Sequence, residues 1–135
     1  MSYQSAAALQ TALFTLLAGD VPLAGLVAGG VHDAPPPGTP QGTYVVIGVE
    51  DVVDRSDGTG PGAEHRILVS VVSDAAGFLT AKAAAARISD ILPGAAPVLT
   101  QGRIVAIWFH QAQARRVAGG ATRRVDLRFR VRVEG

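Results

Sequence analysis

The stretch Arg123–Glu134, RRVDLRFRVRVE, alternates apolar and polar residues over most of its length. Its apolar positions are Val125, Leu127, Phe129, Val131 and Val133. A period of two predicts a β-strand that turns one side toward a hydrophobic core and the other side away from it. We therefore expect this strand to belong to a sheet with one face packed on helices and one charged face.

Three further segments predict strands of the same sheet. Tyr44–Val53 and His65–Val72 are rich in β-branched residues, and Arg103–Ala114 is a third long segment of this kind. The polar, glycine-containing segment Asp54–Gly62 joins the first two, and Ala118–Ala121 joins the third to the final strand. Connections of this type are typical of antiparallel pairs, so the sequence predicts two long hairpins.

Two segments show the apolar spacing of amphipathic helices. The first covers residues 3–18, and the second runs to Leu92 with Asp74 as its expected N-cap. A short helical turn is expected within Val21–Ala28. The order helix, hairpin, helix, hairpin predicts an α+β fold with a mainly antiparallel sheet of about four long strands and two helices on one face.

Length and composition favour a subunit of a larger assembly. The chain has 135 residues, so we expect residues 1–135 to form a single domain without a separate linker. Only 17% of the residues are charged, against about 25% in an average soluble domain. We expect part of the surface to be covered by other subunits.

The uncharged N-terminal residues 1–19 lack the basic start of a signal peptide, and polar side chains interrupt their apolar character. A soluble protein with no membrane partner is therefore expected. The absence of cysteine excludes disulfides, a thiolate nucleophile and cysteine-based metal sites.

Charge is distributed unevenly along the chain. Residues 1–100 hold four basic and nine acidic residues, a net charge of −5. Residues 101–135 hold eight arginines and two acids, a net charge of +6. The molecule is therefore dipolar in sequence, and eleven of its twelve basic residues are arginines, which suit ion pairs at interfaces better than lysines do.

Enzyme signatures are missing from the sequence. The three histidines lack ligand-like spacing, neither HExxH nor GxSxG occurs, and the acids around Asp51 do not follow an EF-hand. The glycine-rich stretch Gly58–Gly62 lacks the Lys-Ser/Thr ending of a phosphate-binding loop. We expect no catalytic residue, cofactor or metal, and hence no enzyme.

Three arginines, Arg128, Arg130 and Arg132, lie at alternate positions of the final strand, about 6.7 Å apart. Such a stripe suits pairing with carboxylates of a neighbouring strand or protein, a solvated face, or contact with a nucleic acid backbone. Aromatic residues make up only 5% of the chain, which argues against base stacking on single strands.

Several segments together resemble one family. They are Val31–Pro36 (VHDAPP), Tyr44–Gly48 (YVVIG), Gly62–His65 (GAEH), Val72-Ser73, Arg103–Val105 and Thr122–Arg130. Their order and spacing are similar to those of the tail terminator (tail completion) proteins of long-tailed phages. The Ala- and Arg-rich composition looks closest to members from alphaproteobacterial gene transfer agents, phage-derived particles that package host DNA. The sequence departs from the family pattern at His32, where Tyr is usual, and at Val72, where Trp often stands.

The resemblance implies a homohexameric ring at the head-proximal end of the tail tube. Such a ring stops tube polymerisation, docks to the stopper or head–tail connector of the neck, and lets DNA pass through its lumen without sequence-specific binding. It implies assembly in the bacterial cytoplasm and a final location at the neck–tail junction of the released particle. The alternatives are another neck component, such as a head-completion adaptor or stopper, and a DNA-binding module.

For a ring of this kind we expect the loops Asp54–Gly62 and Arg115–Thr122 to contact neighbouring rings. We also expect the acidic and basic segments to meet across subunits. The expected interface residues are Asp54, Arg55, Asp57, Arg115, Arg116, Arg123, Arg124, Arg128 and Arg130.

Overall fold

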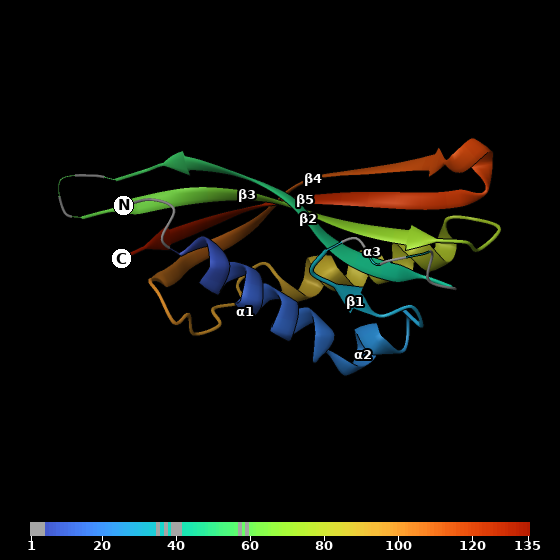
Figure 1. Ribbon diagram of the computed structural model, residues 1–135, viewed down its shortest axis with the longest axis horizontal. Coiled ribbons are helices and arrows are strands. Elements are labelled where there is room, and N and C mark those ends of the chain that lie inside the picture. Colours follow the sequence, from blue (N-terminus) through green and yellow to red (C-terminus); the bar gives the residue numbers. More distant parts are fainter. Residues whose placement is uncertain (1–4, 35, 37, 39–41, 57, 59) are drawn as a thin grey trace.

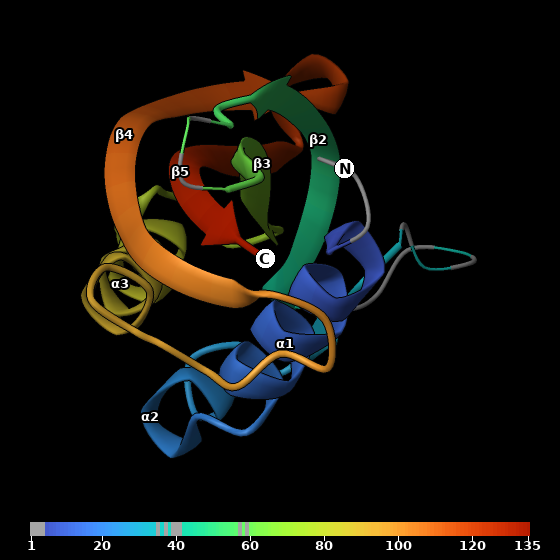
Figure 2. The same ribbon diagram turned by 90° about the vertical axis from the view of Figure 1, so that its left-hand side faces the viewer.

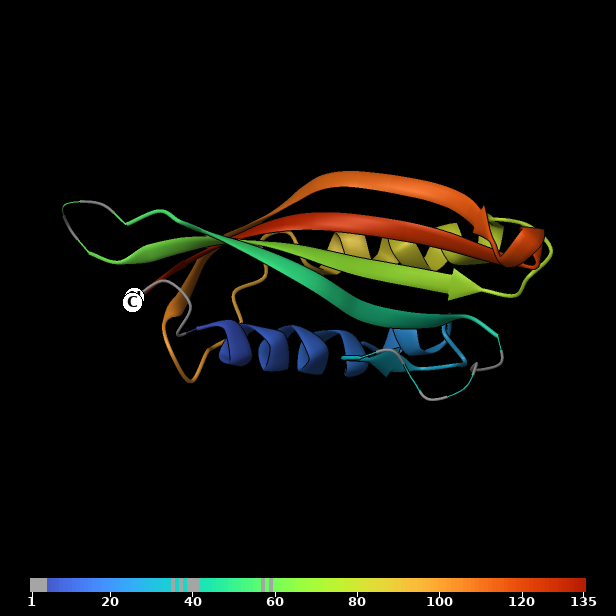
Figure 3. The same ribbon diagram turned by 45° about the horizontal axis from the view of Figure 1, so that its top comes forward.

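The computed structural model describes residues 5–34, 36, 38, 42–56, 58 and 60–135. Along the chain the elements are α1 (Ala6–Ala18), α2 (Val21–Ala24), β1 (Val31–His32), β2 (Tyr44–Asp54), β3 (Gly62–Ser73), α3 (Leu79–Ile91), β4 (Arg103–Val117), the 3-10 turn Ala118–Gly120 and β5 (Thr122–Glu134). A long twisted sheet covers a layer of helices (Figures 1 and 3). The predicted α+β class is confirmed.

The strands form one sheet in the order β1-β2-β3-β5-β4. Its long strands are antiparallel throughout, as β2–β3, β3–β5 and β4–β5 pairs. The two expected hairpins are therefore confirmed. The sequence missed β1, a two-residue strand that pairs parallel to β2 and makes the sheet mixed and five-stranded. A strand this short has no periodicity from which to predict it.

Helices α1 and α3 pack on the same face of the sheet, as expected (Figure 3). The short α2 is a third helix, and it ends at Ala24, earlier than the predicted Ala28. Asp74 was wrongly predicted to cap the second amphipathic helix. Helix α3 begins five residues later at Leu79, and the Asp74 carboxylate instead accepts a hydrogen bond from the Gly42 backbone N–H at 3.1 Å.

Asp20 connects helix α2 to helix α3. Its Oδ2 accepts the backbone N–H of Leu23 at 3.0 Å and so caps α2. Both of its oxygens also receive hydrogen bonds from Arg87 of α3, at 2.9 and 2.8 Å. The bidentate pair with Arg87 holds the pKa of Asp20 below its ordinary value. This pair fixes α2 against α3.

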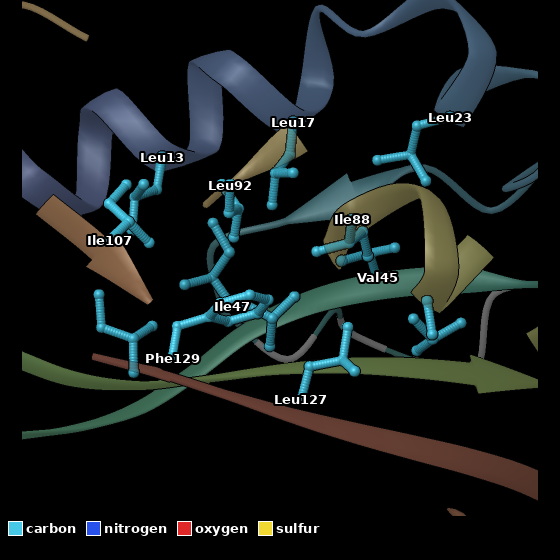
Figure 4. Packing of buried hydrophobic residues seen from close by; sticks show 14 of the residues in the cluster. Leu13, Leu17, Leu23, Val45, Ile47, Ile88, Leu92, Ile107, Leu127 and Phe129 are labelled. Atoms are coloured by element: carbon cyan, nitrogen blue, oxygen red, sulfur yellow. The ribbon is translucent and has the colours of Figure 1, made fainter. Parts of the chain in front are cut away.

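The core lies between the sheet and the helices, with Phe129 near its centre (Figure 4). All five alternating apolar residues of β5 are buried, which confirms the orientation predicted from the sequence. Phe129 also meets Phe109 of β4 edge to face, with ring centroids 5.9 Å apart. The helices contribute Leu9, Leu13 and Leu17 from α1 and a row of alanines with Ile88 from α3.

Strand β4 does not follow simple alternation, because its register against β5 shifts twice, between Ile104 and Ala106 and between Phe109 and Gln111. Each shift adds to β4 one residue that has no partner on β5, and this changes the face of the sheet to which the following side chains of β4 point. As a result Trp108 pairs with Arg130 on the uncovered face, and Phe109 pairs with Phe129 on the core face.

Gly102 begins the last hairpin in a conformation that other residues rarely adopt. Its φ is +78°, and an added Cβ would lie 2.5 Å from Ser5 Oγ and 3.0 Å from the Glu134 carbonyl oxygen. We expect Gly102→Ala to lower the free energy of unfolding by about 2 kcal/mol. Urea titration measures this loss. Gly58→Ala, at a site with open space around it, is the matched control and should change stability little.

Candidate assembly interface

One face of the sheet, here called the outer face, is covered by none of the helices that the structure describes (Figure 3). Strand register places the even-numbered residues of β3 and β5 on it, together with their partners on β2 and β4. Its charged residues are Asp51, Glu64, Arg66, Arg103, Arg115, Arg124, Asp126, Arg128, Arg130, Arg132 and Glu134. Seven arginines against four carboxylates give this face a net charge of +3.

The centre of the outer face holds a basic hollow of about 310 Å³. The charged or polar residues that line this hollow are Asp51, Arg66, His110, Arg128 and Arg130. Arg66 and Arg130 are direct cross-strand partners, an arrangement that like charges disfavour.

Within the described chain, carboxylates form ion pairs with Arg66, and Glu64 also interacts electrostatically with Arg130. The Nε of Arg66 lies 2.8 Å from Glu64, whose pKa the hydrogen bond lowers, and its Nη1 lies 3.7 Å from Asp51. Among the described residues, Arg128 and Arg130 form no ion pair within 4.0 Å, so the hollow presents an excess of positive charge.

The part of the outer face near the β4–β5 turn contains a buried carboxylate, Asp126, to which three neighbouring side chains donate hydrogen bonds. Asp126 is 3% exposed and accepts hydrogen bonds from Ser70 Oγ at 2.7 Å, Arg124 Nε at 2.8 Å and Arg115 Nη2 at 3.2 Å. Burial raises the pKa of Asp126, but the bonds from Ser70 and Arg124 outweigh burial and lower the pKa overall. Among the residues that the structure describes, pairing of arginines with a carboxylate within the sheet therefore occurs at Arg115 and Arg124, and not at Arg128 or Arg130 of the stripe, for which it was one of the alternatives.

Arg123 binds within its own subunit. Its two terminal nitrogens donate to the carbonyl oxygens of Gly120 at 2.7 Å and Ala76 at 2.8 Å, and its guanidinium lies 5.7 Å from the centre of the Phe78 ring. These contacts tie the β4–β5 turn to the segment before α3. Reversing the charge of Arg123 or Arg124 would therefore disturb the fold as well as any contact between subunits.

The expected interface residues do not form one patch. Asp54 and Arg55 lie at the tip of the β2–β3 hairpin, and Asp57 lies outside the described residues. Arg115, Arg116 and Arg123 lie near the β4–β5 turn, together with Arg124. Figure 1 shows these two hairpin ends at opposite ends of the long axis of the molecule. Arg128 and Arg130 lie between them on the outer face.

Sequence reasoning missed an apolar surface beside β4. Trp108 is 48% and Phe109 47% exposed, and every residue from Trp108 to Arg116 is exposed. A groove of about 470 Å³, here called the α3–β4 groove, runs beneath this strand. Its lining residues are Lys82, Ala85, Ala86, Ser89, Phe109, Ala112, Ala114, Val125 and Leu127. The groove is open because α3 and β4 line it with small side chains. The alanines of these two segments were the feature of the sequence from which it could have been predicted.

A second shallow groove, of about 460 Å³, runs along α1. Ala8, Ala12 and Leu16 line it together with Val98, which is 95% exposed. Two apolar grooves on separate elements agree with the expectation that other proteins cover part of this surface.

The described part of the chain contains no group of three or more His, Asp or Glu side chains arranged to hold a metal ion. No helix within it is long and apolar enough to span a membrane.

Comparison with known proteins gives a consistent result. Residues 11–134 match the model of the family described as tail completion protein gp17. The fold matches a chain of a solved structure described as the virion of a native gene transfer agent (GTA) particle, with a TM-score of 0.92. The two sequences are 56% identical, and the match covers 98% of this chain and 99% of the other. No curated protein matches the sequence.

Proposed function

The chain belongs to the tail completion protein gp17 family, and from this premise we propose that it forms a hexameric ring at the head-proximal end of a tail tube. Tail completion proteins are structural components of the virion, and the expected relation to gene transfer agents is confirmed by the match to a GTA virion chain. In the proposed role the ring stops tube polymerisation and joins the tail to the stopper or connector of the neck. Its role is structural and not catalytic.

The single observation that carries this proposal is the end-to-end match, at 56% identity, to a chain of an assembled GTA virion. The shape of the subunit supports it. Its two hairpin ends lie at opposite ends of the long axis, so one subunit can touch a neighbour above and another below at the same time (Figure 1). Hairpin tips on a rigid sheet tolerate reshaping, which suits contacts between different rings.

The basic hollow supports passage of DNA along the outer face. Arg128 and Arg130, unpaired with carboxylates within the described chain, can attract phosphates without reading bases. We propose that this face turns toward the lumen and the helices turn away from it. Transit of DNA needs weak, sequence-independent contacts, and a face with net charge +3 offers them.

Electron microscopy of purified particles tests the proposal. We expect six copies in one ring between the tail tube and the neck, and tubes of uncontrolled length without attached heads in cells that lack the protein. A twelve-fold ring beside the portal would indicate a head-completion adaptor instead. Normal, head-bearing tails in the absence of the protein would contradict the proposal.

The basic outer face also favours a second candidate, an independent DNA-binding module. That function predicts that the isolated protein binds duplex DNA with an affinity that falls steeply with salt, because phosphate contacts release counterions. Titration of labelled duplex at two salt concentrations separates the two functions. A ring component should bind only weakly as a free subunit.

The tip of the β2–β3 hairpin provides a direct test of docking. Deleting residues 56–61 leaves Arg55 and Gly62 as a two-residue turn between the paired residues Asp54 and Ala63, so the fold should survive. We expect unchanged thermal unfolding but loss of attachment of the tail to the tube or neck, seen as detached heads and tails in micrographs. Normally assembled particles would exclude a docking role for this tip.

A further inference from the structure

Strand β4 is the last strand of the sheet, so one row of its backbone N–H and C=O groups faces no other strand of the part of the chain that the structure describes. This free edge is long, because β4 spans 15 residues, and its second half is exposed on both sides. Natural proteins protect such edges, since an open strand pairs readily with another chain. The β4 edge has no proline and no lysine to discourage pairing.

The opposite edge of the sheet is open over part of its length. Strand β1 covers β2 only at Val45 and Val46, and within the described chain no strand pairs with the outer side of residues 48–54. Figure 2, which looks along the strands, shows β2 and β4 on opposite sides of the sheet. One subunit therefore carries two free strand edges, one on each side.

The two edges are complementary in charge. Residues 48–54 (GVEDVVD) contain three acids and no base. Strand β4 contains three arginines, Arg103, Arg115 and Arg116, and no acid. Contact between unlike edges would be attractive, whereas β4 against β4 would bring like charges together.

Strand direction also permits the contact. The four long strands alternate in direction, so β2 and β4 of one sheet run antiparallel to each other. Rotation about an axis close to the strand direction keeps these directions, and β4 of one copy then meets β2 of the next as an antiparallel neighbour. Contacts of this head-to-tail type close into rings.

We propose that the occupant of the β4 edge is a second copy of this chain, whose residues 48–54 pair with β4 as an added antiparallel strand. The inference rests on the proposed ring and names the surface that builds it. Strand register places Asp51 level with Trp108 and Val52 level with Ile107, so the incoming strand lies along the first half of β4, beside the exposed Trp108. Addition of a strand satisfies the exposed backbone groups. It also brings β1 of the second copy toward the α3–β4 groove, because Val45, which pairs with β1, lies level with Ala114.

The absence of native cysteine makes disulfide trapping a clean test. Asp51 and Val53 on β2, and Ala106, Trp108 and Gln111 on β4, all belong to the outer face, and Asp51 lies level with Trp108. Purified particles would carry Asp51→Cys combined with a cysteine at one of the three β4 positions, and would then be oxidised. Opposed residues of an antiparallel pair have Cβ atoms about 4.5–5.5 Å apart, so one of the three pairs should form a bond.

We expect a ladder of covalent multimers up to the hexamer for the best pair. Replacing Asp51→Cys with Val53→Cys should move the best β4 partner to the preceding outer-face position, from Trp108 to Ala106 or from Gln111 to Trp108, because the two strands of an antiparallel pair run in opposite directions. Val46→Cys is the matched control, since it shares the face and the strand but lies where β1 covers the edge. It should give no ladder.

The outcomes separate the inference from the proposed function. A six-fold ring in micrographs without a ladder from any pair would overturn edge pairing and leave the ring in place. A shift in the opposite direction would show parallel pairing and also overturn the inference. Dimers from a single cysteine on β4 would indicate β4–β4 contact instead. Absence of the protein from the tail end would contradict the proposed function itself.

Discussion

Replacing Asp126 with alanine is expected to lower the free energy of unfolding by about 3 kcal/mol. The carboxylate accepts hydrogen bonds from Ser70, Arg124 and Arg115, which come from three strands. Its removal leaves a buried hydroxyl short of a partner and two guanidinium groups without their counter-charge. The half-exposed Arg115 can turn to water, which keeps the loss below that of a fully buried pair. Urea denaturation measures the change.

Asp51→Ala is the matched control for that experiment. Asp51 also lies on the outer face and contacts an arginine, but its side chain is 73% exposed and lies 3.7 Å from Arg66. Surface pairs of this kind contribute about 0–1 kcal/mol. Equal losses in the two variants would show that the buried network has no special role in stability.

The same residue sets a pH dependence. The pKa of Asp126 is lowered in the folded protein, so its charge stabilises the fold above the unfolded pKa, and this contribution is lost as the pH falls through the folded pKa. Stability of the natural protein should therefore fall below about pH 4. The difference in stability between it and Asp126→Asn should be largest near neutral pH and shrink on acidification. A difference that is constant from neutral to acidic pH would contradict the assignment.

Much of the sheet could be predicted because the signals were local. The unbroken alternation in Arg123–Glu134 determines which side chains enter the core, and the glycine-containing turns mark both hairpins. The order of the strands in the sheet could not be predicted from local sequence patterns. Pairing of β3 with β5 joins residues such as Ser70 and Asp126, and no short-range pattern of the chain encodes that contact.

The interface was harder to predict than the fold. Charge counting identified the arginines, but it could not tell Arg124, which pairs with Asp126 in its own chain, from Arg128, which forms no such pair among the described residues. The exposure of Trp108 and Phe109 depends on the irregular register of β4, which appears only when its partner strand is known. The α3–β4 groove could not be predicted for the same reason, because it exists only once the small residues of α3 and β4 are packed side by side.

Introducing a charge into the α3–β4 groove should prevent assembly without unfolding the subunit. Ala114 is exposed and lines this groove, so Ala114→Glu should leave thermal unfolding nearly unchanged. If a second copy covers the groove, the new carboxylate is desolvated, at a cost of about 3 kcal/mol per contact. That cost corresponds to an association about 100-fold weaker.

Native mass spectrometry and counts of tailed particles measure the effect of Ala114→Glu. We expect loss of the hexamer and few complete tails. Ala83→Glu is the matched control, because Ala83 is an exposed alanine of α3 that does not line the groove. If both variants assembled like the natural protein, this groove would remain open in the particle, and the subunits would have to meet through other parts of their surface.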